Sequence, residues 1–258
     1  MTIKNALVWA TQKLAKNNFI SAQLDAEILL SLTLKQNKEF LYAKPEFKLN
    51  LLQKIRFFYF TNKRLKNWPI AYLTHHKEFY GYNFYVNKHV LTPRPETEGI
   101  IDLAIEEIKK CYMLHATCYT ICDIGTGSGC IIITLISELQ KNNYNLDNFK
   151  FYATDISGAA LRVAKKNARL QQVEKHIEFL HGDLLKPLQA KTIDLILANL
   201  PYLELTDLNE PSIKKEPKLA LLGNYDEFFK QAGVIHGSPL HPKPIIIYED
   251  KTGICLKK

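Results

Sequence analysis

Residues 1–75 place apolar side chains at the spacing of amphipathic helices, about 3.6 residues per turn. In the first predicted helix the positions on one face are Ile3, Leu7, Ala10 and Leu14. In the second, which Ser21 can cap, they are Leu24, Ile28 and Leu32. Two further helices are expected at 38–43 and at about 50–66, and the aromatic run 57–60 is expected in the core. This part of the chain is predicted to be a small helical bundle.

Residues 78–86 change to the alternating pattern of β-strands, with Gly81 placed for a turn, and predict a β-hairpin. In the following segment Pro95 is placed to begin a helix that continues past residue 100. We therefore divide the chain into a helical domain (1–75), a hairpin linker (76–98) and a larger third domain (99–258).

From residue 119 onward, apolar runs of strand length alternate with helical patterns. Strands are expected at 119–123, 150–154, 176–180 and 192–198, with helices at 130–140 and 158–171. Such alternation predicts an α/β fold with a parallel, doubly wound sheet. Ligands bind beyond the carboxyl ends of the strands in sheets of this kind.

Composition narrows the class of protein only slightly. The chain has 258 residues, 47% of them hydrophobic. Its net charge of +8 comes from scattered basic residues, which favours a solvated basic surface over a nucleic-acid partner. The five cysteines form no C-x-x-C pair, which favours free thiols in a cytoplasmic protein over zinc or disulfides; they are Cys111, Cys118, Cys122, Cys130 and Cys255. No secretory leader and no membrane span of roughly 20 apolar residues is expected.

A glycine-rich turn between the first of these strands and its helix carries the most informative motif. Its residues are Asp123, Ile124, Gly125, Thr126, Gly127, Ser128 and Gly129. A dinucleotide fingerprint would need glycine at position 130, where the chain has Cys130. The spacing G-x-G-x-G after an acidic residue resembles the first motif of class I S-adenosylmethionine-dependent methyltransferases. Asp123 could then accept a hydrogen bond at the cationic methionine end of the cofactor, and the glycines would make room for that end.

The ends of the later strands add polar side chains to the same edge of the sheet. Asp155, Asp183 and Asn199 each follow a predicted strand, and Asp155 is placed to bind both ribose hydroxyls. Each of these residues alone could be a helix cap. Together with the glycine turn they describe one adenosyl pocket, to which Leu184 would contribute a wall.

The tetrad Asn199-Leu200-Pro201-Tyr202 suggests the chemistry. A neutral amide or amino nitrogen is a poor nucleophile, and two acceptors on its NH2 group can aim it at a sulfonium methyl group. The Asn199 side-chain oxygen and the Leu200 carbonyl would be those acceptors, and they would also stabilise the developing positive charge. Tyr202 would pack on the planar group. Neither a nucleophilic triad nor a metal is needed.

A longer resemblance covers roughly residues 20–225. The matching segments are Arg64, 69–72, 78–81, the L-x-P-R-P-E-T-E run at 91–98, the D-I-G-T-G-S-G turn at 123–129, and Glu216-Pro217 with Ala220, Leu221 and Gly223. In these segments the chain resembles the peptide chain release factor N5-glutamine methyltransferases, the HemK-like family. The resemblance implies methyl transfer from S-adenosylmethionine to a glutamine in a class 1 release factor, without a direct requirement for nucleic acid. It also implies that the helical domain docks the release factor.

Four positions depart from the family pattern. The usual tetrad is Asn-Pro-Pro-Tyr, so Leu200 loses the fixed φ of proline; the form found here resembles that of the rRNA adenine dimethyltransferases. Leu184 stands where the family often has tryptophan, and Trp68 and His75 stand where it has glycine.

The C-terminal segment has two interpretations. In the first, 245–249 is the fifth strand of the family's sheet and the later elements are absent. In the second, 245–249 and 254–257 form the closing hairpin and the fifth strand is missing. Both leave the sheet short of seven strands.

Three functions stay open at this point. The first is glutamine methylation of a release factor. The second is N6 methylation of adenine in RNA or DNA, which would need a flipped base. The third is a degenerate homologue that binds a translation factor without transferring methyl groups.

Overall fold

The computed structural model describes residues 1–112, 119–202, 213–221, 223, 225–237 and 243–257. The chain divides into two compact units, Met1–His75 and His76–Lys258. Each unit has hydrophobic cores of its own.

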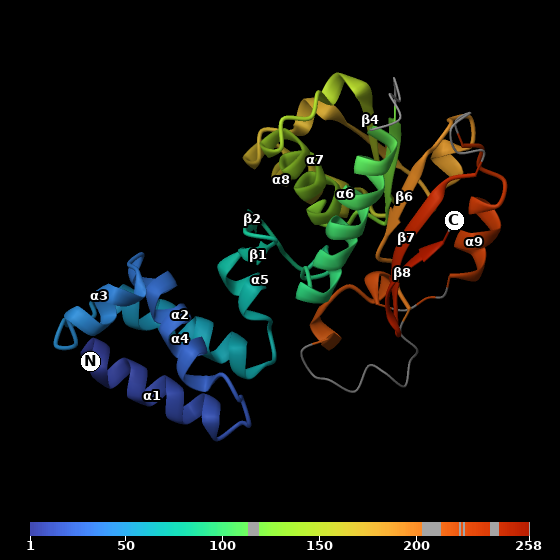
Figure 1. Ribbon diagram of the computed structural model, residues 1–258. Helices are drawn as coiled ribbons and strands as arrows, with labels where there is room; N and C mark the ends of the chain where they lie inside the picture. The colour runs from blue at the N-terminus through green and yellow to red at the C-terminus, as the bar shows by residue number, and fades with distance from the viewer. Residues whose placement is uncertain (113–118, 203–212, 222, 224, 238–242, 258) are drawn as a thin grey trace. The chain divides into compact units, whose positions relative to one another are not determined.

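The first unit is the predicted helical bundle (Figure 1). Its helices are α1 (Ile3–Ala15), α2 (Ala22–Leu34), α3 (Lys38–Ala43), α4 (Leu51–Leu65) and α5 (Ile70–Thr74). Polar side chains begin three of them: Thr2 and Asn37 each accept a backbone N–H, and Asn50 forms a capping box with Gln53. The core of the bundle gathers Ile3, Leu14, Leu29, Leu30 and Phe57.

Two predictions for helix α2, its buried face and its Ser21 cap, are wrong. Leu24 is exposed, and the buried face instead contains Asp25, Leu29 and Leu30. The reason is that α2 packs against both α1 and α4, where the carboxylate of Asp25 meets Arg64 at 2.6 Å. Ser21 makes no capping bond, because its hydroxyl donates to Asp25. Of the aromatic run 57–60 in α4, only the first residue is fully buried.

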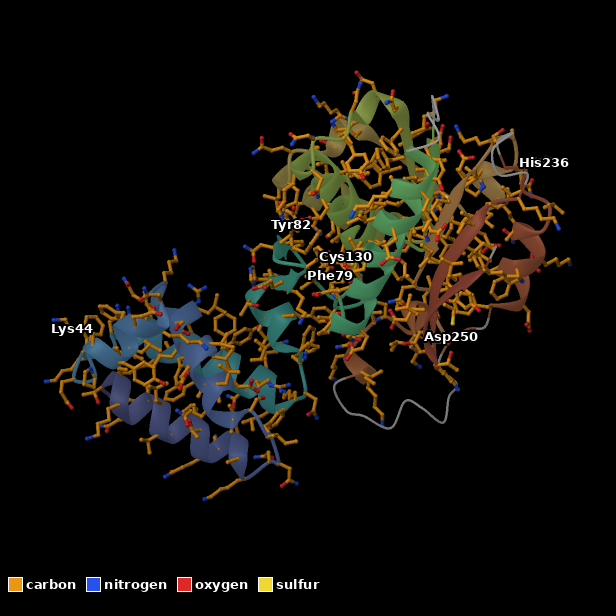
Figure 2. All side chains as sticks on the ribbon, viewed as in Figure 1. Lys44, Phe79, Tyr82, Cys130, His236 and Asp250 are labelled. Atoms are coloured by element: carbon orange, nitrogen blue, oxygen red, sulfur yellow. The ribbon has the colours of Figure 1, made fainter. Side chains whose placement is uncertain are left out.

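The predicted hairpin opens the second unit. Strands β1 (Lys77–Phe79) and β2 (Tyr82–Phe84) pair antiparallel around Tyr80 and Gly81, both with positive φ. This geometry is the tight hairpin turn that matches the strand twist. Phe79 and Phe84 are buried in the same core as Cys130 of the sheet domain, and Figure 2 labels Phe79 and Cys130. The hairpin is therefore part of the second unit's hydrophobic core.

The centre of the second unit is a six-stranded sheet in the order β5-β4-β3-β6-β7-β8 among the described residues. The strands are β3 (Tyr119–Ile124), β4 (Phe149–Asp155), β5 (Ile177–His181), β6 (Leu195–Ala198), β7 (Ile245–Asp250) and β8 (Gly253–Lys257). All neighbouring pairs are parallel except β7 with β8. The predicted strands and the α/β doubly wound sheet are confirmed.

Helices cover both faces of this sheet (Figure 1). On one face lie α6 (Glu98–Tyr112), α7 (Cys130–Lys141) and α8 (Gly158–Leu170), and on the other lies α9 (Asp226–Ala232). The first residues of the helical path, Pro95–Thr97, form a 3-10 turn (η1) that leads into α6, as the position of Pro95 predicted. Ile121 and Leu197 point into the core under α6 and α7, whereas Ile196 faces Phe228 of α9.

The two interpretations of the C-terminal segment are each partly right. β7 lies parallel beside β6, so the fifth strand is present and its predicted deletion is wrong. The hairpin of the second interpretation also forms, because β8 pairs antiparallel with β7 across a turn at residues 250–253. The described sheet therefore has six strands, short of seven as both interpretations expected.

Two further features concern the length of the helices and the state of the cysteines. No helix within the described parts of the chain is long and apolar enough to cross a membrane. Cys122, Cys130 and Cys255 are free thiols, the first two of them buried. Cys118 and the side chain of Cys111 lie outside the described residues.

Candidate active site

The predicted site residues meet at the carboxyl edge of the sheet. The glycine turn follows β3, Asp155 ends β4, and Asn199 follows β6. Glu249 lies near the end of β7, the next strand along the sheet; Figure 2 labels its neighbour Asp250. Parallel pairing thus brings residues from four segments of the chain to one place.

The glycine turn is held against its neighbours on both sides. Gly125 has φ +67°, and a Cβ atom there would lie 2.8 Å from Leu200 Cδ2, so a larger residue would be strained and would displace the Leu200 side chain. Asn167 of α8 donates to the Ser128 carbonyl at 2.8 Å and to the Tyr85 carbonyl at 3.0 Å. It also accepts the Tyr85 N–H, so one fully buried amide joins the turn to the segment after the hairpin.

Asp123 lies beneath this turn and is fully buried. Its Oδ2 accepts the hydroxyl of Thr126 at 2.6 Å, while Oδ1 has no hydrogen bond of ordinary geometry. Burial raises the pKa of the Asp123 carboxyl to about 7, although the hydroxyl of Thr126 opposes the shift. The Ile132 N–H also interacts with this carboxyl and opposes the shift, so Oδ1, which has no hydrogen bond of ordinary geometry, stays a candidate acceptor for a bound donor.

Asp155 connects the end of β4 with the glycine turn. Its Oδ2 accepts the Gly127 N–H at 2.9 Å, and its Oδ1 accepts the Ser157 N–H at 2.7 Å. Burial raises the pKa of Asp155, and these two backbone donors oppose the shift. The bonds fix the direction of the carboxylate, and each oxygen keeps a further lone pair for a ligand.

A cavity of about 270 Å³ lies in front of these groups. Six predicted cofactor residues line it: Gly125, Gly127, Asp155, Asp183, Leu184 and Asn199. The other four are not among its lining residues: Asp123, Thr126, Ser128 and Gly129. Those four build the turn from behind, so a direct contact between Asp123 and a cofactor stays a prediction.

The far wall of this cavity contains Leu184, which has the left-handed φ of +50°. The hydroxyl of Thr154 donates to the Leu184 carbonyl at 3.0 Å and ties this unusual backbone to β4. Asp183 at the cavity edge is half exposed and pairs with Lys186 at 2.6 Å. A salt-paired surface carboxylate of this kind is a weaker candidate for ligand binding than Asp155.

Two hydrogen bonds from its amide nitrogen fix the orientation of the Asn199 side chain in the tetrad. Nδ2 donates to Thr97 Oγ1 and to Glu249 Oε2, both at 2.9 Å. Thr97 in turn donates to the same carboxylate oxygen at 2.6 Å. Because a carboxylate can only accept, the amide must present its nitrogen to Glu249, which leaves Asn199 Oδ1 for another donor.

Glu249 also holds the last member of the tetrad. Its Oε1 accepts the Tyr202 hydroxyl at 3.1 Å. Burial, with the negative charge of Glu249 second, raises the pKa of Tyr202 to about 12, so the phenol keeps its proton as the donor. Glu249 and Thr97 were not predicted as site residues. The position of Glu249 could have been predicted from the expected strand 245–249, because the carboxyl ends of adjacent parallel strands lie at the same edge of a sheet.

A second cavity, of about 360 Å³, opens on the other side of the tetrad and is lined by Arg94, Glu96, Tyr202 and Glu249 among others. The two cavities share one wall, made of Leu91, Asn199, Leu200, Pro201 and Ala220. Arg94 forms an ion pair with the buried Glu216 at 2.8 Å, which ties the segment 91–97 to the segment that carries Ala220. Gly223 approaches the Pro201 carbonyl so closely that a Cβ atom would lie 2.9 Å from its oxygen.

The first cavity fits the cofactor that the sequence motif implies. S-adenosylmethionine needs acceptors for its ribose hydroxyls and for a cationic methionine end. Asp155 on the cavity wall offers acceptors for the ribose hydroxyls, whereas a contact of Asp123 with the methionine end stays a prediction, because Asp123 does not line the cavity.

Comparison with known proteins finds a match for both units of the chain. Residues 5–74 match the family model of the PrmC N-terminal domain, and residues 116–235 match that of a methyltransferase domain. The release factor glutamine methyltransferase of Moorella thermoacetica is 36% identical over 228 residues, which cover 88% of this chain and 76% of that protein. That of Bacillus anthracis is 34% identical over 263 residues, which cover 98% and 87%.

Among solved structures, the N-terminal domain of human METTL16 in complex with SAH has a TM-score of 0.42 at 20% identity. The similarity covers 66% of this chain and 61% of that one.

The parallel sheet, the glycine turn and the matching domain model define a class I S-adenosylmethionine-dependent methyltransferase. Sequence identity above 30%, over most of this chain and of each relative, narrows the class to one family of these enzymes. The chain belongs to the release factor glutamine methyltransferase family.

Proposed function

We propose that this protein transfers the methyl group of S-adenosylmethionine to the side-chain amide nitrogen of a glutamine in a class 1 peptide chain release factor. The family supports the reaction, since two relatives with this name are 36% and 34% identical to the chain over the aligned residues. The cofactor would occupy the cavity at the glycine turn, and the glutamine side chain would enter the cavity beside Tyr202.

The observation that carries the proposal is the common wall of these two cavities. Asn199, Leu200 and Pro201 line both, so a group bound on one side meets a group bound on the other at the tetrad. The bound cofactor supplies an electrophilic methyl group. Transfer between two ligands requires this kind of juxtaposition, and holding the reactants in line supplies much of the rate.

The residues of the tetrad then have separate tasks. Asn199 Oδ1, set in direction by Thr97 and Glu249, accepts one hydrogen of the substrate NH2 group. The Leu200 carbonyl accepts the other, and the ring of Tyr202 packs on the amide plane. Because both acceptors are fixed before the substrate arrives, they stabilise positive charge on the nitrogen without reorganising.

The test is methyl transfer from labelled S-adenosylmethionine to a release factor in single-turnover reactions. We expect label on the target glutamine and none when that glutamine is replaced by alanine. Asn199→Ala should slow the transfer roughly 10²–10³-fold, the usual loss for one preorganised polar contact. Its affinity for S-adenosylhomocysteine should fall far less than the rate of transfer, which separates lost chemistry from lost folding.

Two other results would replace the proposal. Label on RNA but not on the release factor would favour adenine methylation, which could use the same tetrad. Tight binding of S-adenosylhomocysteine with no transfer to either substrate would show a degenerate homologue.

A further inference from the structure

Leu200 brings a backbone N–H group to a position where proline would have none. The residue is only 5% exposed, so this donor needs a partner inside the protein. The partner is the hydroxyl of Tyr225, which accepts the Leu200 N–H at 3.1 Å.

The Tyr225 hydroxyl is itself held in place. It donates its own proton to the backbone carbonyl of Glu249. A phenol can both accept and donate, so one hydroxyl bridges the tetrad to strand β7. Burial raises the pKa of Tyr225 well above its usual range, which keeps that proton in place.

The ring of Tyr225 is fixed by its neighbours. Tyr225 stands directly before α9, and its ring lies 5.6 Å from Phe228, 5.7 Å from Phe229 and 5.2 Å from Tyr248. Aromatic contacts at these distances restrict the direction in which the hydroxyl can point. The hydroxyl is therefore a rigid support for the Leu200 N–H.

We propose that Tyr225 is a positioning residue for methyl transfer, which replaces by a hydrogen bond the backbone rigidity that proline would give at position 200. The inference rests on the proposed role of the Leu200 carbonyl as an acceptor for the substrate nitrogen. Tyr225 holds the N–H end of Leu200, and the ring of Pro201 restricts its other end. Between these two constraints the Leu200 carbonyl keeps its direction toward the shared wall of the cavities.

A double-mutant cycle of Tyr225→Phe and Leu200→Pro tests this coupling. In the parent, Tyr225→Phe leaves a buried N–H unpaired and should slow single-turnover transfer at saturating substrate roughly tenfold. In the Leu200→Pro protein there is no N–H to support, so the same change should slow transfer less than about twofold. Within each background, Tyr225→Phe should change the affinity for S-adenosylhomocysteine less than about twofold, since Tyr225 does not line the cofactor cavity. An equal loss in both backgrounds would overturn the proposal.

Amide hydrogen exchange gives a second measurement that needs no substrate. The Leu200 amide should exchange roughly tenfold faster in Tyr225→Phe than in the parent, because its acceptor is gone. Tyr248→Phe, a change in the same aromatic cluster, should leave that exchange unchanged. Unchanged exchange in Tyr225→Phe would refute the hydrogen bond. If the parent transfers no methyl group to a release factor, the proposed function fails, while the exchange result still decides whether Tyr225 holds the Leu200 N–H.

Discussion

Glu249 accepts hydrogen bonds through three different oxygen atoms, and through them it reaches most of the tetrad. Oε2 accepts from the Thr97 hydroxyl and the Asn199 amide, and Oε1 accepts from the Tyr202 hydroxyl. The backbone oxygen accepts from the Tyr225 hydroxyl. Both hydrogens of the Asn199 amide are used in this network. The side chain of Asn199 therefore cannot turn its nitrogen toward the substrate without breaking two bonds.

Thr97→Val should test the network without touching the cavities. Valine has a similar shape but no hydroxyl, so one hydrogen of the Asn199 amide loses its acceptor in a buried place. We expect the methylation rate to fall roughly tenfold, since an unpaired buried polar group costs about 1–3 kcal/mol. Thr97→Ser keeps the hydroxyl and should stay close to the parent rate. A valine variant as fast as the serine variant would contradict the role of this bond.

Asp123 makes the stability of the cofactor-free protein depend on pH. Its pKa is about 7 in the folded protein against 3.8 as the ordinary value, so the folded state holds this proton more tightly than the unfolded state. Stability from this group is thus full below about pH 4 and is lost as pH rises through 7.

Asp123→Asn cannot ionise and should lack this loss. The free energy of unfolding of the variant, relative to the parent, should therefore rise between pH 5 and pH 8, as measured by urea unfolding without cofactor. The same difference at both pH values would show that Asp123 is ionised throughout this range in the folded protein.

At the scale of elements, Asn167 joins helix α8 to the glycine turn and to the segment after the hairpin. Asn167→Ala removes three hydrogen bonds, two to Tyr85 and one to Ser128. We expect a loss of about 1–3 kcal/mol in the free energy of unfolding and weaker binding of S-adenosylhomocysteine, because the turn loses its support.

The matched control for Asn167→Ala is Gln171→Ala, at the end of the same helix. Gln171, directly after α8, donates to the Asn83 carbonyl of the hairpin at 2.8 Å and makes no bond to the turn. Gln171→Ala should leave the affinity for S-adenosylhomocysteine unchanged, as calorimetry can show. Equal losses of affinity in both variants would mean that the hairpin, and not the turn, is what Asn167 supports.

The helices and strands also show which parts of the structure could be predicted from the sequence. Strands such as 150–154 and the glycine turn were predictable, because their apolar runs and glycines are local signals. The hydrogen bond between Thr97 and Glu249 joins residues 152 positions apart, and no local pattern records which distant residues will meet. For the same reason the buried face of α2 was assigned wrongly, since it depends on packing against α1 and α4.

At the scale of the whole molecule, the two units contain separate hydrophobic cores. The bundle core includes Phe57, and the two cores of the second unit lie on opposite faces of the sheet. A unit with its own core can unfold in its own cooperative transition. The cofactor cavity is lined only by residues of the second unit among those described.

Scanning calorimetry of the full chain should therefore show two transitions that respond to different changes. Saturating S-adenosylhomocysteine should raise only the transition of the second unit, since a ligand stabilises the part that binds it. Phe57→Ala empties a fully buried site of the bundle and should lower only the other transition, at a cost of about 3–5 kcal/mol. Tyr59→Ala, two residues along α4 and 55% exposed, should leave both transitions nearly unchanged. The units would be shown to unfold together by a single transition whose midpoint temperature rises with the ligand and falls with Phe57→Ala.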